Sequence, residues 1–375
     1  MALEPGFLVI HSNQLEQLRS LLVQFCQRYP LSPLELEQVL VQSNGIAQWL
    51  KLAFAASPDE ADPYERGLGI AAAMQVQLPG RFIWSMYQLA LPEQQLPDLS
   101  VFSKDSLRWR IFRLLPALVA QDEFELLRRF ISDDKDQQKR SQLALKLADL
   151  FDQYQVYRAD WLQSWRSGTN LLPNSKKQQV PDDQLWQPAL WRLLQSQLAN
   201  VVGELAFSSR ADVHTTALAA LQQGKLARPD LLPDRIVVFG VSSLPQQTVE
   251  LLAALGAQRQ VLLTVLNPCR HFWGDITAAK DEVRAAQKRH GRKPGLPAVL
   301  DADALYLHAP VLLASLGKQG RDYISLLDAF DQSGQYRHWF NGRIDLFSEP
   351  VEDVSSLPLL AQLQQDILEL NPTPQ

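Results

Sequence analysis

The sequence predicts an α/β domain with a parallel sheet, interrupted by an inserted all-helical domain. Three observations indicate this fold class. Short apolar runs alternate with helical periods near the N-terminus, helical periods alone fill the middle of the chain, and the strand–helix alternation then returns. With 375 residues, 46% of them hydrophobic, the chain is long enough for two or three domains with their own cores.

The N-terminal segment predicts a β-α-β-α order. Its apolar runs are short and bounded by turn residues, and Asn13 is placed to cap the first helix. Either Ser43 or Asn44 is placed to cap the second. The expected elements are strands at 7–10, 39–42 and 68–76, helices at 15–25 and 46–55, and a further helix that ends near residue 91.

Strand signals stop near residue 100 and return near residue 233. The segment between them predicts helices at 107–118, 123–130, 141–165, 185–200 and 212–223, with a polar loop at 168–183. Strands are then expected at 235–240 and 260–266, helices at 246–255 and 357–370, and a turn-rich stretch at 330–357. We therefore expect residues 1–99 together with 233–375 to form the α/β domain and residues 100–232 the helical insert. This is the layout of the first half of a superfamily 1 helicase, and other doubly wound folds share it.

Charge and composition exclude several classes of protein. The net charge of −5 argues against a protein that wraps duplex DNA through bulk positive charge, although a local nucleic-acid groove stays compatible with it. Two cysteines far apart and six isolated histidines predict neither a disulfide scaffold nor a zinc site. The absence of a secretory signal and of a long apolar run predicts a cytoplasmic protein that does not contact a membrane.

The stretch 39–50 has the strand–turn–helix order of a phosphate-binding loop but not its chemistry. It lacks the Lys and the following Ser or Thr that hold phosphates and magnesium, and strand 236–240 has no carboxylate for the metal. ATP hydrolysis by this chain is therefore not expected. The polar side chains here are the amides Gln42, Asn44 and Gln48, which can donate to and accept from base edges. An ordinary turn with a polar surface is the alternative.

A second cluster lies on the helix expected over residues 141–165. Asp149, Asp152 and Gln153 share a face beside the apolar stripe. Carboxylates repel phosphates but accept hydrogen bonds from base amino groups, so they suit splayed single-stranded bases. A solvated acidic face on a core helix is the alternative, and an acid/base catalytic pair has no supporting His or metal-ligand pattern nearby.

Aromatic residues lie close in sequence to both polar clusters. Most are expected in the core, while one or two at a groove wall could stack on bases at about 1–3 kcal/mol each. A basic run at 284–293 is interpreted as a solvated loop, with a phosphate contact as the alternative. The aromatic residues are Trp49, Trp84, Tyr154, Tyr157, Trp161 and Trp165.

Several collinear blocks together resemble the RecC family, the gamma subunit of exodeoxyribonuclease V. No single block is specific, but jointly they cover essentially the whole chain. The blocks are residues 11–13, 40–50, 78–79, 82–84, 148–154, 157–158, 267–270, 272–276, 313–315, 317–318, 320–323 and 363–368.

The resemblance implies a P-loop-NTPase-like, superfamily 1 helicase-like domain whose motor motifs have degenerated. Such a subunit has no catalytic site or cofactor of its own; ATP and Mg are used by the partner subunits, RecB and RecD. It guides the 3′-ended single strand and recognises the Chi sequence during double-strand break repair, within a bacterial complex that is an ATP-dependent helicase and exonuclease.

Carried over by motif, the Chi-contacting positions of the family fall in the clusters above and beside them. Asn44 stands where the family pattern has Thr, which leaves the recognised DNA sequence open, and the residues flanking Arg210 differ from the pattern. The matching residues are Gln42, Asn44, Gln48, Leu78, Trp84, Asp149, Leu150, Asp152, Gln153, Arg158 and Arg210.

The resemblance also implies an N-terminal part of a longer subunit, because a full member of the family is much longer than this chain. Two other functions remain open. The chain could be a scaffold that only holds the motor subunits, which a single-strand binding assay distinguishes. An active nucleotide hydrolase is opposed by the missing Lys and carboxylates, and a titration with ATP and magnesium distinguishes it.

Overall fold

The computed structural model describes most of the chain, and every structural statement below concerns the described residues. These residues form two compact units: one comprises Met1–Phe82, Leu232–Leu244 and Thr248–Gln375, and the other comprises Ile83–Leu231 and Pro245–Gln247. We call them the sheet unit and the helical unit. The described residues are 5–94, 96–97, 100–133, 137–173, 178–202, 210–224, 226, 228–274, 276, 310–332, 340–348 and 358–371.

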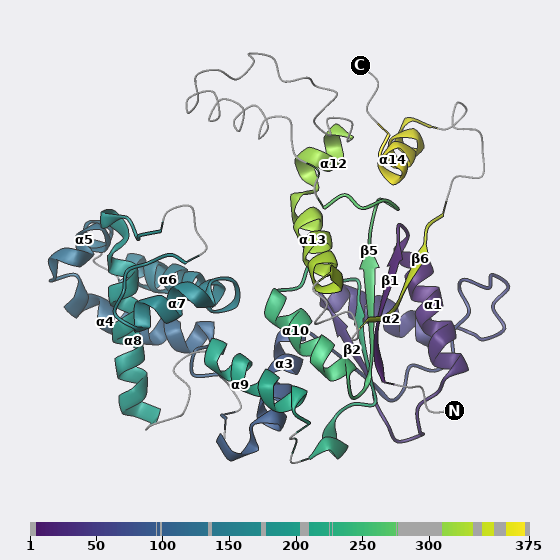
Figure 1. Ribbon diagram of the computed structural model, residues 1–375, viewed down its shortest axis with the longest axis horizontal. Helices are drawn as coiled ribbons and strands as arrows, with labels where there is room; N and C mark the ends of the chain where they lie inside the picture. Colours follow the sequence, from purple (N-terminus) through teal and green to yellow (C-terminus); the bar gives the residue numbers. More distant parts are fainter. Residues whose placement is uncertain are drawn as a thin grey trace. The chain divides into compact units, whose positions relative to one another are not determined.

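The sheet unit is built on six parallel strands in the order β3-β2-β4-β5-β1-β6 (Figure 1). This arrangement confirms the predicted α/β class with a parallel sheet. The strands are β1 (Gly6–Ser12), β2 (Glu37–Val41), β3 (Met74–Gln77), β4 (Arg235–Phe239), β5 (Gln260–Leu266) and β6 (Phe340–Leu346).

The central strands are apolar because helices cover both faces of a parallel sheet. All five residues of β4 are buried, and β5 is buried from Val261 to Val265. Residues of α1 and α2 pack with β1, β2 and β4 in one core cluster. The helices of this unit are α1 (Leu15–Arg28), α2 (Asn44–Ala55), most of α10 (Gln246–Gly256), α12 (Val311–Leu316), α13 (Lys318–Gln332) and α14 (Leu359–Glu369).

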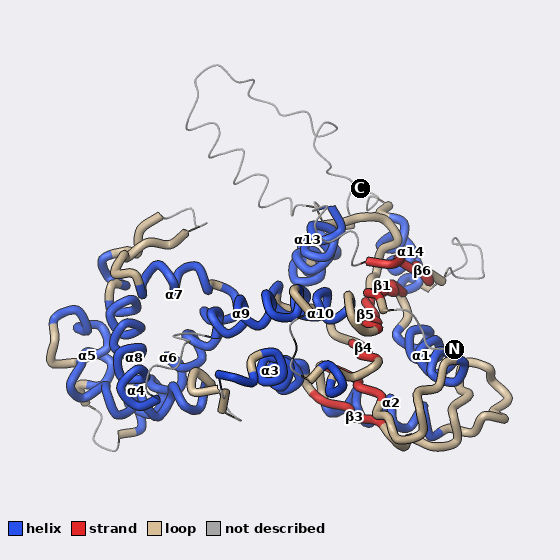
Figure 2. Tube along the Cα trace, turned by 60° about the horizontal axis from the view of Figure 1, so that its bottom comes forward, coloured by secondary structure: helices blue, strands red, loops and turns tan. Residues whose placement is uncertain are grey.

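The helical unit has a separate core. Phe151 stacks on Trp191 with ring centroids 5.6 Å apart, and Trp165 is buried in the same cluster. Figure 2 shows helices as the main regular elements of this unit. They are most of α3 (Pro79–Ala90), α4 (Lys104–Leu118), α5 (Glu125–Ile131), α6 (Gln138–Tyr157), α7 (Ala159–Arg166), α8 (Trp186–Val202) and α9 (Arg210–Gln222), with 3₁₀ turns at Pro92–Gln94, Asp122–Phe124, Asp182–Gln184 and Pro229–Leu231.

Both cysteines are free and buried, in agreement with the prediction that no disulfide holds the fold. Burial raises the pKa of the Cys26 thiol to about 12 and that of Cys269 to about 11. Both thiols therefore stay protonated at neutral pH and pack as small apolar side chains.

Local backbone geometry explains where the elements differ from the expectation. The third strand is only Met74–Gln77, because Gly69 and Ala73 take positive φ values of 76° and 52° before it. The helix expected over 141–165 is two helices, since Arg158 leaves the helical region at φ −141° and ψ 45°.

Two further differences involve β6. Asn13 does not cap α1; its amide Nδ2 donates to the Ser348 carbonyl and its Oδ1 accepts from the Ser348 N–H, both at 3.0 Å.

Strand β6 itself lies in the stretch expected to be turn-rich. Its Asn-Gly pair is a weak strand signal, and pairing with β1 at the sheet edge stabilises it instead. The basic run at 284–293 lies outside the described residues.

Candidate nucleic-acid interface

The amide cluster lies on the loop after β2 and on the first turns of α2. Ser43, not Asn44, caps the helix: its Oγ accepts from the Ile46 N–H at 3.3 Å. Gln42, Asn44 and Gln48 are all exposed to solvent. Because the cap fixes the start of α2, these three amide side chains project from an ordered backbone.

The loop after β4 is the neighbour of this cluster, because β2 pairs with β4. The Oε1 atom of Gln42 accepts from both the N–H and the hydroxyl of Ser242, each at 3.3 Å. The Gln42 side chain is thereby oriented, and its Nε2 remains the donor end of the amide. Sequence reasoning did not find Ser242, because the contact requires knowing that these two strands are adjacent.

The strand order places the loop at residues 43–45 beside a point where the direction of the chain across the sheet reverses. In open α/β sheets, ligands bind where the strand order reverses, outside the carboxyl ends of the strands. Here adjacent strands continue in opposite directions at β2 and β4, and again at β5 and β1. The Gln42 loop follows β2 and therefore lies at the first of these two points.

Buried polar side chains lie near the carboxyl ends of β1 and β5. Asn267 is 1% exposed and accepts at 2.9 Å from Nε1 of Trp273, which is itself 2% exposed. The other end of the Asn267 amide lies 3.5 Å from Nδ1 of His11. Buried polar groups at this position are therefore satisfied from within the chain.

Two apolar residues of the predicted set flank the β3–α3 turn. Leu78 lies between the two elements and is 49% exposed. Trp84 is half-buried on α3, donates from Nε1 to the Pro97 carbonyl at 2.9 Å and packs edge-on against Tyr87. Leu78 belongs to the sheet unit and Trp84 to the helical unit.

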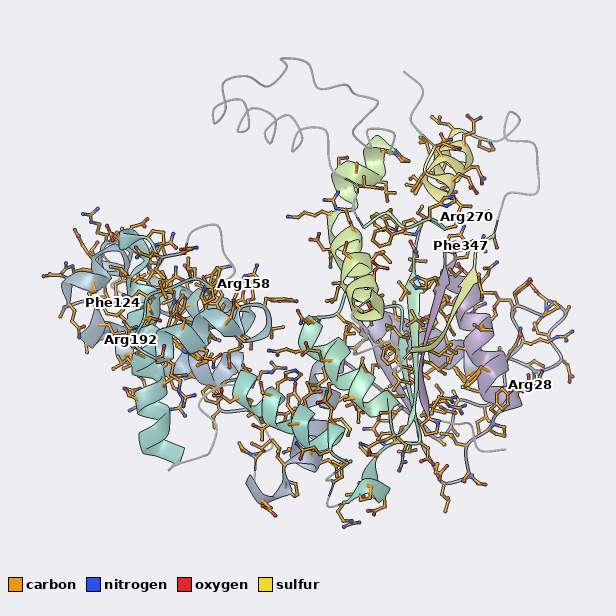
Figure 3. The ribbon with its side chains drawn as sticks, in the orientation of Figure 1. Arg28, Phe124, Arg158, Arg192, Arg270 and Phe347 are labelled. Atoms are coloured by element: carbon orange, nitrogen blue, oxygen red, sulfur yellow. The ribbon has the colours of Figure 1, made fainter. Side chains whose placement is uncertain are left out.

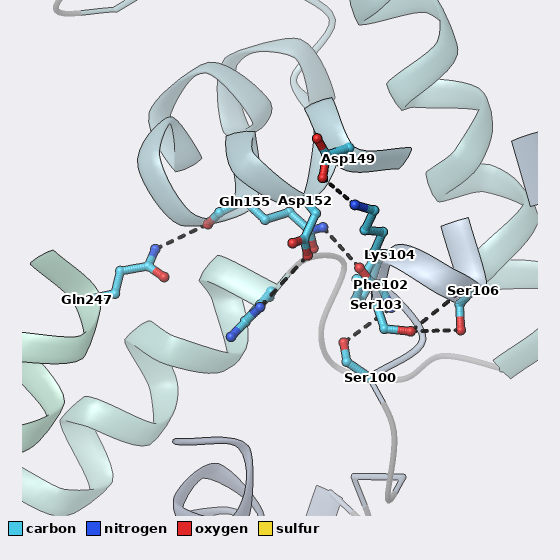
Figure 4. A network of polar contacts seen from close by, with 10 residues as sticks. Ser100, Phe102, Ser103, Lys104, Ser106, Asp149, Asp152, Gln155 and Gln247 are labelled. Carbon is cyan, nitrogen blue, oxygen red and sulfur yellow. Dashed lines mark hydrogen bonds and ion pairs between the residues drawn. The ribbon is translucent and has the colours of Figure 1, made fainter. Parts of the chain in front are cut away.

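The residues of the acidic cluster lie together on α6 (Figure 4). Asp149 is held from both sides: Nζ of Lys104 lies 2.5 Å from its Oδ1, and Nε2 of Gln153 donates to its Oδ2 at 3.3 Å. The Lys104 hydrogen bond holds the pKa of Asp149 below its ordinary value. This carboxylate therefore stays charged, and an acceptor, at any neutral or mildly acidic pH.

Asp152, one turn along the helix, has a different environment. Burial raises the pKa of Asp152 above its ordinary value, and the positive charges of Arg210 and Lys104 partly oppose that rise. Nη1 of Arg210 lies 3.9 Å from Oδ1 of Asp152, which brings α9 to the same cluster. The structure thus places Arg210, the weakest of the motif matches, beside the acidic residues.

The C-terminal end of α6 adds a cation and aromatic rings. Arg158, labelled in Figure 3, donates to the Tyr157 carbonyl at 2.8 Å and lies over the Trp161 ring at 5.4 Å from its centroid. Tyr157 is 59% exposed, whereas Leu150 is half-buried. Asp149, Gln153 and Tyr157 are spaced by four residues, so an acceptor, an amide and an aromatic ring follow one face of the helix.

The predicted residues therefore form two groups, one in each unit. The first has exposed amides on the loop after β2 and on α2, and the second has charged and aromatic side chains on α6 and α9. Lys104 was missed. The sequence does contain a signal for it: a Lys follows directly after Ser103, the cap of α4, and the helix dipole disfavours a cation at that position.

Among the residues that the structure describes, no group of three or more His, Cys, Asp or Glu side chains is placed to hold a metal ion. None of the helices described is both long enough and apolar enough to span a bilayer.

Comparison with known proteins gives a consistent result. The family model "RecC, N-terminal domain" matches residues 7–370. The chain is 36% identical to the RecBCD enzyme subunit RecC of Escherichia coli K12 over 96% of its own length, and 32% identical to that of Haemophilus influenzae over 98%. A Mycolicibacterium smegmatis RecC is 24% identical over 79% of the chain. The chain spans 30% and 34% of the length of the first two relatives.

Proposed function

This chain belongs to the RecC N-terminal domain family, and on that premise we propose that it is the part of a RecBCD-type enzyme that reads single-stranded DNA. In this proposal the chain guides the 3′-ended strand and recognises a Chi-like sequence, while partner subunits of the RecB and RecD type use ATP and magnesium. The chain itself contributes no catalytic group. Its fold is that of a superfamily 1 helicase whose motor site has been lost.

The proposal rests on the chemistry of the two groups of side chains. Amides, an ionised carboxylate and an exposed tyrosine present donors, acceptors and a ring face to solvent from helices, whose backbones are rigid. Unstacked bases are recognised by hydrogen bonds to their edges and by stacking on aromatic rings. A protein that only gripped the DNA backbone would use Lys and Arg instead.

The missing Lys of the loop at 43–45 and the missing carboxylates of β4 support the view that this chain does not hold a nucleotide. The sequence contains no Gly-Lys-Ser/Thr loop that could hold a triphosphate. Micromolar, saturable binding of Mg-ATP to the chain would contradict this view.

The test uses the full-length subunit assembled with its partner subunits. Gln42→Ala and Asp149→Ala should each weaken the response of the complex to its recognition sequence, while unwinding of DNA without that sequence continues at the wild-type rate. The response is measured as the change in the length of the single-stranded products.

The control for Asp149→Ala is Asp230→Ala, which removes another exposed carboxylate that forms an ion pair, at 2.8 Å from Arg228. It should leave both readouts unchanged. A wild-type response in both test variants would contradict the assignment of these residues to DNA recognition. The chain would then act as a scaffold for the motor subunits.

A further inference from the structure

We infer that Lys104 is a positioning residue of the proposed base-reading site: its ammonium group orients the Asp149 carboxylate and offsets its charge, so that single-stranded DNA can approach α6. The inference rests on the proposed function and adds a residue that the motif matches do not contain. Lys104 comes from α4, a different helix from the one that carries the acidic cluster.

The position of Lys104 is fixed by its own helix. It is the first residue of α4, directly after Ser103, whose Oγ accepts from the Ser106 N–H at 3.4 Å. Helix α4 packs along α6 through Leu107, Ile111 and other buried residues of the same core. The start of α4 therefore holds the Lys104 side chain beside Asp149, as Figure 4 shows.

The contact leaves Asp149 able to accept from a ligand. Lys104 donates to Oδ1 and Gln153 donates to Oδ2. Each carboxylate oxygen has about two lone-pair sites, so each can accept one more hydrogen bond. The side chains of Lys104 and Asp149 are 43% and 40% exposed, so a base can reach both. The pair also presents a donor beside an acceptor, which a base edge carrying an amino group and a carbonyl oxygen could match.

Stability of the fold does not account for this ion pair. Exposed ion pairs contribute little to stability, and a cation in the first turn of a helix is opposed by the helix dipole. These two effects nearly cancel. A Lys at this position therefore needs an explanation other than the stability of α4.

Charge balance supplies that explanation. Asp149 and Asp152 place two negative charges on adjacent turns of α6, and every nucleotide of a single strand adds one more. Lys104 and Arg210 bring one positive charge each from α4 and α9. Lys146 adds a third positive charge near Asp149, so removal of Lys104 would change the net charge of this cluster from +1 to 0 and weaken its attraction for the phosphates of the strand.

The test is binding of a fluorescent single-stranded oligonucleotide to the full-length protein, measured from pH 4 to pH 8. Lys104→Met should weaken binding about 3- to 10-fold at pH 7, in keeping with the loss of one charge-assisted contact. Lys104→Arg should restore most of the affinity. Lys139→Met is the matched control, because Lys139 forms an equally short 2.5 Å pair with Asp133 in the same helical unit.

The dependence of oligonucleotide binding on pH distinguishes a positioning role of Lys104 from a purely structural role. Lys104 holds the pKa of Asp149 low, so its removal should move the acid limb of binding to higher pH. The other charged groups near Asp149 are Lys146 and Asp152 on α6 and, through Asp152, Arg210 on α9; all are unchanged in the variant. An NMR titration of the Asp149 carboxyl carbon without DNA should show the same rise in pKa.

Three results would overturn the inference. Unchanged affinity in Lys104→Met is the first, and weakened binding with an unmoved acid limb and no rescue by Arg is the second. The third is an Asp149 pKa that stays low in the variant. Failure of the wild-type protein to bind the oligonucleotide would instead reject the proposed function, and this inference with it.

Discussion

Polar residues of this chain divide into buried ones that hold the fold and exposed ones that we propose contact DNA. Arg235, at the start of β4, is 1% exposed. Its Nε donates to Oε2 of Glu37 at 2.9 Å and its Nη2 to the Tyr29 carbonyl at 2.9 Å. Removal of one partner of such a pair leaves an uncompensated charge inside the protein.

We therefore predict that Arg235→Leu lowers the free energy of unfolding by about 3–5 kcal/mol, because Glu37 loses its partner. The measurement is urea denaturation followed by tryptophan fluorescence. Arg228→Leu removes an ion pair whose two side chains are about 60% exposed, and should leave the free energy of unfolding nearly unchanged. Equal effects of the two substitutions would show that the buried pair is not structurally important.

At the scale of secondary structure, the residues of most helices and strands could be predicted because their apolar spacing is regular. Strands β4 and β5 are nearly continuous apolar runs, and α1 repeats its apolar residues with helical spacing. The exceptions have local causes that spacing does not reveal. Positive φ at Ala73 shortens β3, and Arg158 divides one expected helix into two.

The candidate site could be predicted only where one segment contains it. Asp149, Asp152 and Gln153 share a helix face, so spacing alone brought them together. The Gln42–Ser242 contact depends on β2 lying beside β4, and the Lys104–Asp149 contact joins residues 45 positions apart. Such contacts are set by tertiary packing, which a pattern within one element does not encode.

The cap of α2 gives a prediction at this scale. Ser43→Ala should destabilise the first turn of α2 by about 1 kcal/mol, because the Ile46 N–H loses its acceptor. Hydrogen exchange at Ile46 and Ala47 should accelerate, while exchange in α1 stays the same. Ser43→Asn should keep the wild-type rates, since Asn also caps helices. Unchanged exchange in Ser43→Ala would show that the cap does not hold the amide cluster.

Considered as a whole, the chain has two cores, and each unit carries part of the proposed reading surface. The core cluster of the sheet unit includes α1 and α2, and that of the helical unit includes α4, α6 and α8. Neither contains the exposed side chains assigned to DNA. Substitutions at those positions should therefore alter recognition with little effect on folding, since surface changes usually shift stability by about 0.5 kcal/mol or less.

We propose that single-stranded bases contact the Gln42 loop, α2 and α6 of this chain. The most direct measurement is photo-crosslinking of a single strand carrying 4-thiothymidine to the full-length subunit in its assembled complex, with the adducts located by mass spectrometry. We expect adducts in the peptides that contain residues 42–48 and 149–158. Adducts confined to other segments, with these two peptides unmodified at saturating DNA, would contradict it.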